Sequence, residues 1–230
     1  MKNRFIRTLK LYIRSCMNPI LLIFALTIIV GLPIALACSP SPRGDKEYPV
    51  MLGCAGMGHM GLLILQIFCM VTFSRSKFFI STADAKRLFT VIPVVVSTAM
   101  GIIYDAVVVI VGLIFIDLPT AADLMIVCSL STVVCAFSVS ANGKKGLEII
   151  STLAFMLICC ESITMKEATA LRNGFGLTLA GAALVSAAVL IIGIGLTVLI
   201  MRLWWSKSDR IKRSLNTTVP MVIPEMFGGS

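Results

Sequence analysis

The side chains with the greatest chemical potential in this sequence lie inside long apolar segments. Asp105 follows Tyr104 near the middle of one such segment, and His59, the only histidine of the chain, lies inside another. If these segments cross a bilayer, a charge at Asp105 costs at least ~2.5 kcal/mol, so this side chain should face a partner or water. Asp105 could contact a substrate or act at a hinge, but the interpretation we favour is a buried hydrogen bond between helices.

Two methionines accompany the histidine and define a candidate substrate path. Met57 and Met60 flank His59, and methionine adapts to irregular apolar ligands, so these three residues and Asp105 form the predicted path or intramembrane polar site. The run 56–61 also matches G-x-G-x-x-G. A dinucleotide site needs that turn between a strand and a helix of a soluble unit, whereas glycines inside a membrane helix let neighbouring helices approach closely. We therefore expect close packing here and no nucleotide.

The sequence offers no pattern typical of an enzyme or a metal site. A single histidine cannot complete a usual zinc site, and the chain contains no C-x-x-C pair. Most of the eight cysteines lie in apolar runs, where cysteine behaves as a small hydrophobe. The phosphate-binding pattern G-x-x-x-x-G-K-[ST] is absent, so the chain should not hydrolyse ATP itself. We expect no catalytic residue, no metal and no cofactor in this chain.

The composition indicates the elements that must position these residues. The chain is 58% hydrophobic and 13% charged, whereas soluble domains are about 25% charged. Segments of about 20 apolar residues can cross a bilayer as helices. Six segments qualify, at about 20–38, 51–73, 90–116, 121–142, 148–165 and 174–201. The sequence predicts an all-α polytopic membrane protein, with one six-span domain over 18–205 and a cytoplasmic tail over 206–230.

The positive charges set the predicted orientation. With the N-terminus inside, sixteen of the twenty Lys and Arg residues fall in inner segments, and an excess of these residues marks the cytoplasmic side. Both termini are therefore predicted to be cytoplasmic. We therefore interpret the net charge of +9 as a signal of orientation. Because the charge is not gathered on one soluble face, we expect no nucleic-acid partner. Asp123 lies near the end of a span, where exposure would make its charge inexpensive.

Residues 1–17 are predicted to form an amphipathic helix before the first span. Apolar residues recur with helical spacing from Phe5 to Ile13. Basic side chains fall on another side of the helix: Arg4, Arg7, Lys10 and Arg14. A helix of this kind lies in the headgroup layer with its basic face toward anionic lipid, so membrane lipids are a predicted partner. The alternative is a plain basic anchor that only fixes orientation.

The inner loop 74–89 is the second informative segment outside the spans. Ser81 and Asp84 have the spacing of a capping box, which could begin a short helix over about 82–89 that ends before Pro93. Apolar and charged side chains of this loop would form a docking surface for a cytoplasmic partner: Lys77, Phe78, Phe79, Asp84, Lys86, Arg87, Leu88 and Phe89. The alternative is a solvated basic loop that serves orientation alone.

Six spans in about this length, an N-terminal elbow helix and a basic loop running into Lys86-Arg-Leu-Phe-Thr-Val-Ile-Pro93 resemble a small permease of the type-two ABC exporter class. The resemblance covers the whole topology, and its sequence signal lies in residues 74–93. It implies that the loop carries a coupling helix for an ATPase subunit, with the coupling role on Lys77, Phe78, Phe79, Asp84, Lys86 and Arg87. It also implies the elbow role for Arg4–Arg14.

The resemblance implies the partners and the location as well. ABC ATPase subunits would bind ATP and Mg²⁺, and the permease would pair with itself or with a second permease, in a bacterial cytoplasmic membrane. The outer region at about 163–174 is shorter than in larger relatives, which puts in doubt an outer domain that gates substrate.

The expected function is export of an amphipathic or hydrophobic substrate, such as a peptide, toxin or antimicrobial, by alternating access. One alternative is the substrate-binding membrane subunit of an energy-coupling vitamin importer, although its ligand pocket would need outer loops richer in polar groups. Another is a bacteriocin-immunity or sensor membrane protein that does not transport.

Overall fold

The computed structural model describes residues 2–16, 19–31, 34, 48–75, 85–115, 118–142, 144, 146–159 and 161–206. Within these ranges the chain is helical and contains no strand, as predicted. The helices are α1 (Lys2–Cys16), α2 (Pro19–Leu26) with the π-helical segment η1 (Thr27–Gly31), α4 (Tyr48–Arg75), α6 (Ala85–Thr90), α7 (Ile92–Phe115), α8 (Leu118–Ala141), α9 (Leu147–Cys159), α10 (Glu161–Phe175) and α11 (Leu179–Ser206).

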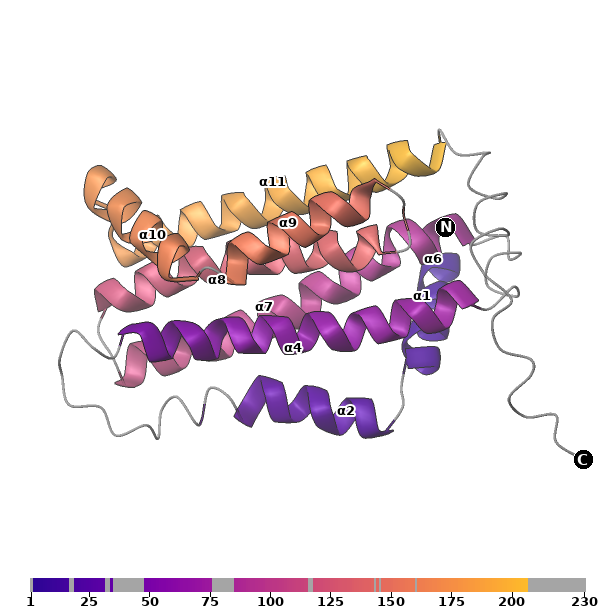
Figure 1. Ribbon diagram of the computed structural model, residues 1–230, viewed down its shortest axis with the longest axis horizontal. Coiled ribbons are helices and arrows are strands. Elements are labelled where there is room, and N and C mark those ends of the chain that lie inside the picture. The colour runs from indigo at the N-terminus through magenta and orange to yellow at the C-terminus, as the bar shows by residue number, and fades with distance from the viewer. Residues whose placement is uncertain are drawn as a thin grey trace, which may run out of the picture.

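The long helices lie side by side along the longest axis of the molecule, and short helices lie at both ends (Figure 1). Helices α1 and α6 meet at one end, and α10 lies at the other. Among the described residues, three helices are long and apolar enough to cross a membrane, over Ala85–Phe115, Leu118–Ala141 and Leu179–Trp205. The chain therefore has the helices of a membrane protein, while the number of its crossings and their orientation stay predictions.

Helix α8 is the central helix of the bundle, since it contacts α4, α7, α9, α10 and α11. Two thirds of its apolar span is buried (67%), against 17% for α11. Its buried residues are mostly small, which allows neighbouring helices to approach on every side. The exposed apolar side chains of α11 suit contact with lipid, because lipid tails are as apolar as leucine.

The buried apolar side chains form two clusters. The first includes Tyr104 and Leu124, and the second, at the α1–α6 end, includes Tyr12, Phe89 and Val139. Along α7 and α8, the residues between the two clusters are polar and buried: Ser97, Thr98, Ser129, Ser131 and Thr132. The core thus contains an internal polar layer, and the candidate site borders on it.

The structure differs from the expected fifth span at 148–165. Helix α9 ends at Cys159, and a separate helix, α10, runs from Glu161 to Phe175 through the segment expected to be an outer loop. The sequence of α10 is polar, so it folds by packing one face on the end of the bundle, where it contacts α4, α8 and α9. The expected inner helix over 82–89 corresponds to α6, which begins at Ala85; residues 82–84 lie outside the described part of the chain.

Candidate functional site

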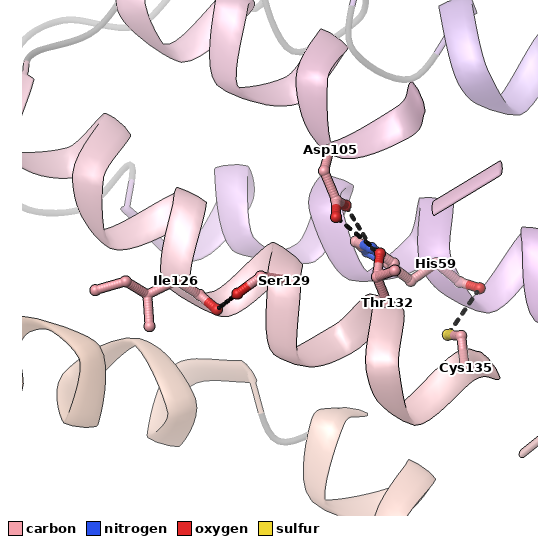
Figure 2. Close-up of polar contacts among 6 residues, drawn as sticks. All are labelled: His59, Asp105, Ile126, Ser129, Thr132 and Cys135. Atoms are coloured by element: carbon pink, nitrogen blue, oxygen red, sulfur yellow. Dashed lines mark hydrogen bonds and ion pairs between the residues drawn. The ribbon is translucent and has the colours of Figure 1, made fainter. Parts of the chain in front are cut away.

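A polar cluster joins the three helices α4, α7 and α8 (Figure 2). His59 Nε2 lies 2.8 Å from Asp105 Oδ1, and Thr132 Oγ1 donates a hydrogen bond of 2.7 Å to Asp105 Oδ2. His59 Nε2 also lies 3.3 Å from Thr132 Oγ1. We call these three residues the His59–Asp105–Thr132 cluster. Both carboxyl oxygens of Asp105 therefore have a partner inside the protein, as an acidic group in an apolar medium requires.

The chemistry of the cluster depends on one proton. When Asp105 is ionised, His59 must carry a proton on Nε2, because a carboxylate can only accept hydrogen bonds. The pair can then be an imidazolium with a carboxylate, or a neutral imidazole that donates to the carboxylate. The cluster can therefore bind and release a proton without losing its interhelical contacts. This is the principal chemical capacity that the described residues show at the site.

Glycines allow the helices of the cluster to come this close. A Cβ atom on Gly58 would lie 2.0 Å from Tyr104 Oη, and one on Gly101 would lie 2.4 Å from Thr132 Oγ1. Tyr104 is fully buried, and its ring meets the His59 imidazole edge-on, with 5.0 Å between ring centroids. The run 56–61 thus serves close helix packing, in agreement with the interpretation made from the sequence.

The cluster is closed around the histidine and more open at the carboxyl group. The side chain of His59 is 3% exposed, whereas that of Asp105 is 14% exposed. Cys135 Sγ lies 3.7 Å from the backbone oxygen of His59 and adds a weak contact between α8 and α4. Met57 and Met60 are exposed on α4 and are not part of the cluster. The predicted group of four residues therefore separates into one interior pair and two surface methionines.

The residues of the predicted elbow helix form the helix α1, whose apolar face packs on protein; its role as an elbow helix stays a prediction. Tyr12 and Thr8 are buried, and α1 contacts α4, α6 and α7. The side chains of Arg7, Lys10 and Arg14 are exposed; Arg4 belongs to α1, and its side chain lies outside the described part. The bundle end offers α1 an apolar surface, so only a flank of the helix remains for lipid. That flank includes Ile6 and Ile13, which are both exposed.

The predicted coupling residues fall into two groups. Lys77, Phe78, Phe79 and Asp84 lie outside the described residues. Lys86 is exposed at the start of α6, and Arg87 is half-buried.

Leu88 and Phe89 do not belong to a docking surface, contrary to the expectation. They are 2% and 5% exposed because they pack into the second apolar cluster, where Phe89 stacks on Trp205 with 6.4 Å between ring centroids.

Lys144 is a buried residue that the sequence reasoning treated only as an orientation signal. It is 4% exposed, and its Nζ donates to the backbone oxygens of Phe89, at 3.2 Å, and Ser140. The ammonium group also lies 5.5 Å from the centre of the Trp204 ring. A cation is stabilised near carbonyl oxygens at helix C-termini, so Lys144 ties the ends of α6 and α8 to α11. In the sequence, the signal that could have indicated this role is the position of Lys144 directly after a predicted span.

Asp123 is buried, contrary to the expectation that it would be exposed at a span end. It is 2% exposed; Arg172 Nε donates to its Oδ1 at 2.7 Å, and Thr169 Oγ1 donates to its Oδ2 at 2.8 Å. Both donors belong to α10, which covers this end of α8. This contact was not predicted, because residues 163–174 were expected to form a loop. The Asp123–Arg172 pair fastens α10 to the bundle.

Within the described ranges, no group of three or more His, Cys, Asp or Glu residues could hold a metal ion. Comparisons with models of protein families, with curated proteins and with solved structures gave no match. The function must therefore be inferred from the geometry.

Proposed function

We propose that the chain is the permease subunit of an ATP-driven exporter of the type-two ABC class. It would move an amphipathic or hydrophobic substrate, such as a peptide, toxin or antimicrobial, across a bacterial cytoplasmic membrane by alternating access. The observation that carries this proposal is the packing of α1 and α6 into one apolar cluster at a single end of the bundle. In the class that the sequence resembles, an elbow helix and a coupling helix face the ATPase from that side.

The charges support the orientation that this function needs. The described helices and their ends carry ten basic residues at the α1–α6 end: Lys2, Arg4, Arg7, Lys10, Arg14, Arg75, Lys86, Arg87, Lys144 and Arg202. Lys and Arg accumulate on the cytoplasmic side of membrane proteins, so this end would be cytoplasmic and α10 would lie outside. The crossings would be α2 with η1, α4, α7, α8, α9 and α11, with both termini in the cytoplasm.

The connections of α6 suggest how force would enter the membrane domain. The loop at 77–84 leads into α6, and α6 continues through Val91 into α7, which carries Asp105. Lys144 links α6 to α8 and α11. ATP and Mg²⁺ would bind the partner ATPase, which would pull the loops of two paired permeases together. Displacement of α6 would then move α7 and α8 relative to their neighbours.

Co-purification with a partner ATPase tests the proposal. The neighbouring genes are searched for an ATP-binding cassette ATPase, the full chain is expressed with that ATPase, and both association and ATP hydrolysis are measured. The double substitution Asp84→Lys with Phe79→Ala should abolish association and the stimulation of hydrolysis. The matched control is Glu167→Lys with Phe175→Ala, which makes the same chemical changes at exposed positions of α10 and should alter neither.

Two results would count against the proposal. If the wild-type chain neither binds nor stimulates such an ATPase, the exporter assignment is wrong. If the loop variant keeps full association and stimulation, the docking role of residues 77–87 is wrong.

A further inference from the structure

Besides Thr98 on α7, three buried polar side chains, one each on α4, α7 and α8, have an atom without a hydrogen-bond partner among the described residues. They are Gln66 on α4, Ser97 on α7 and Ser138 on α8, through Oε1, Oγ and Oγ respectively. Their residues are only 3%, 2% and 4% exposed. Buried polar groups in native proteins nearly always have a partner, which is either protein or ordered water. Three such atoms on three neighbouring helices require a common explanation.

The three side chains lie at one level of the bundle. Each is displaced along its own helix toward the α1–α6 end, from His59, Asp105 and Thr132 respectively, by about 9–12 Å at ~1.5 Å per residue. Gln66 faces α7, because its Nε2 contacts Met100 Sδ at 3.6 Å. Ser97 precedes Met100 by one turn and therefore shares that face of α7.

Ser138, like Ser97, lies on the face of its helix that is turned toward α4. It follows Cys135 by one turn of α8, and Cys135 contacts the backbone oxygen of His59. The three polar side chains therefore line the interface directly beyond the His59–Asp105–Thr132 cluster, at the level of the second apolar cluster, whose residues flank Gln66 on α4 and Ser138 on α8.

The chemistry of Gln66 identifies water as the missing partner. A serine hydroxyl inside a helix can donate to a carbonyl of its own helix, so Ser97 and Ser138 could satisfy themselves. The side-chain oxygen of Gln66 is an acceptor, and the backbone N–H groups around it are already bonded within α4. It needs a donor from outside its helix. Water can donate to this oxygen and also bond the two hydroxyls, which is the usual role of buried water.

We propose that this level of the α4–α7–α8 interface binds water, and that a short chain of water molecules runs from it to the His59–Asp105–Thr132 cluster. Thr132 continues the polar surface, since its hydroxyl lies against Gly101, one turn from Ser97 on α7. The titratable groups that contact the His59 imidazole are Asp105 and Tyr104 from α7, and Cys135 from α8 contacts the backbone oxygen of the same residue. The hydrated interface gives the pair a means of exchanging protons, independently of the exporter assignment.

The single histidine makes a direct test possible. The full chain, carrying a tag without histidine and ¹⁵N-labelled at histidine, is reconstituted in phospholipid bilayers for solid-state NMR. Transfer of magnetisation from water to the ring nitrogens then reports on His59 alone. We expect transfer in the wild-type protein, and a several-fold slower transfer in Gln66→Leu and Ser97→Val. Ser186→Val is the matched control, because Ser186 is also buried and unpartnered but lies on α11.

The outcomes that overturn the inference are specific. It is wrong if water does not reach His59 in the wild-type protein, and this result needs no variant to fold. It is also wrong if Gln66→Met and Ser97→Val keep the thermal stability and the transfer rate of the wild type. Transfer that is slowed equally by Ser186→Val would place the water elsewhere and overturn it as well.

Discussion

Asp105 has two partners of different chemistry, and they should contribute differently to stability. The imidazole of His59 can carry a charge, whereas Thr132 provides one neutral hydroxyl donor. Removing one partner of a buried ion pair costs about 3–5 kcal/mol in soluble proteins. Single hydrogen bonds between membrane helices average ~0.6 kcal/mol, because a membrane-inserted unfolded state also finds partners. Loss of the carboxyl group should therefore outweigh loss of the hydroxyl.

The substitutions Asp105→Ala and Thr132→Val test this difference. We expect Asp105→Ala to lower the free energy of unfolding by about 3 kcal/mol, since it removes the acidic partner of the buried imidazole. Thr132→Val should cost about 1 kcal/mol. The control is Ser129→Ala, because the Ser129 hydroxyl donates to the carbonyl of Ile126 in its own helix (Figure 2). Reversible unfolding in mixed micelles gives the values. A cost for Thr132→Val no larger than that of the control would contradict the prediction.

The sequence predicted that Asp105 needs a partner, but it could not name that partner. The energetic cost of a charge in an apolar segment is a local property, whereas the pairing with His59 depends on how two helices are aligned. That alignment is set by close contacts such as Tyr104 against Gly58. The burial of Asp123 was missed for the same reason, since its partner Arg172 lies on a helix that was expected to be a loop.

At the scale of helices, two of the three glycines of α11, Gly193 and Gly195, have opposite surroundings. A Cβ atom on Gly193 would lie 2.5 Å from Val133 Cγ1, whereas one on Gly195 would have no atom within 4 Å. The two positions are two residues apart in one helix. They therefore separate the effect of helix packing from the effect of helix propensity.

We expect Gly193→Ala and Gly195→Ala to change stability in opposite directions. Gly193→Ala should lower the free energy of unfolding by about 1–3 kcal/mol, because Val133 must move to admit the methyl group. Gly195→Ala should be neutral or raise it by up to about 1 kcal/mol, since alanine favours a helix over glycine. Thermal unfolding of the two variants in the same detergent measures the difference. Equal losses in both would show that α11 does not pack on α8 through Gly193.

Helix type was predictable from long apolar runs, but the break between α9 and α10 was not. The apolar run from residue 149 continues past Cys159, so a count of apolar residues extends the span to about 165. The structure begins a new helix at Glu161 because Ala168 is buried and Thr169 and Arg172 bond to Asp123. These are tertiary contacts, and the hydropathy of a segment carries no information about them.

For the whole molecule, the two ends of the bundle should lie on opposite sides of the membrane. Alkaline phosphatase is active only when it is exported, so fusions report the side on which the fusion point lies. We expect a fusion after Gly176, which follows α10, to be active, and a fusion after Lys144 to be inactive, in keeping with the basic end being cytoplasmic. Fluorescent-protein fusions at the same residues should give the reverse pattern. Activity after Lys144 would contradict the orientation.

The order of the helices along the chain has a consequence for synthesis on the ribosome. In the proposed topology, helix α4 leaves the ribosome before α7, so His59 would already be in the membrane when Asp105 enters beside it. Thr132 follows on α8 and completes the cluster. Asp123, by contrast, must wait for Arg172, but it lies near a helix end, where headgroups and water are close. In this topology Asp105 lies farther from the ends of its helix than Asp123, and its partner His59 would be inserted first, so the unfinished chain would not hold an unpaired Asp105 charge in the bilayer.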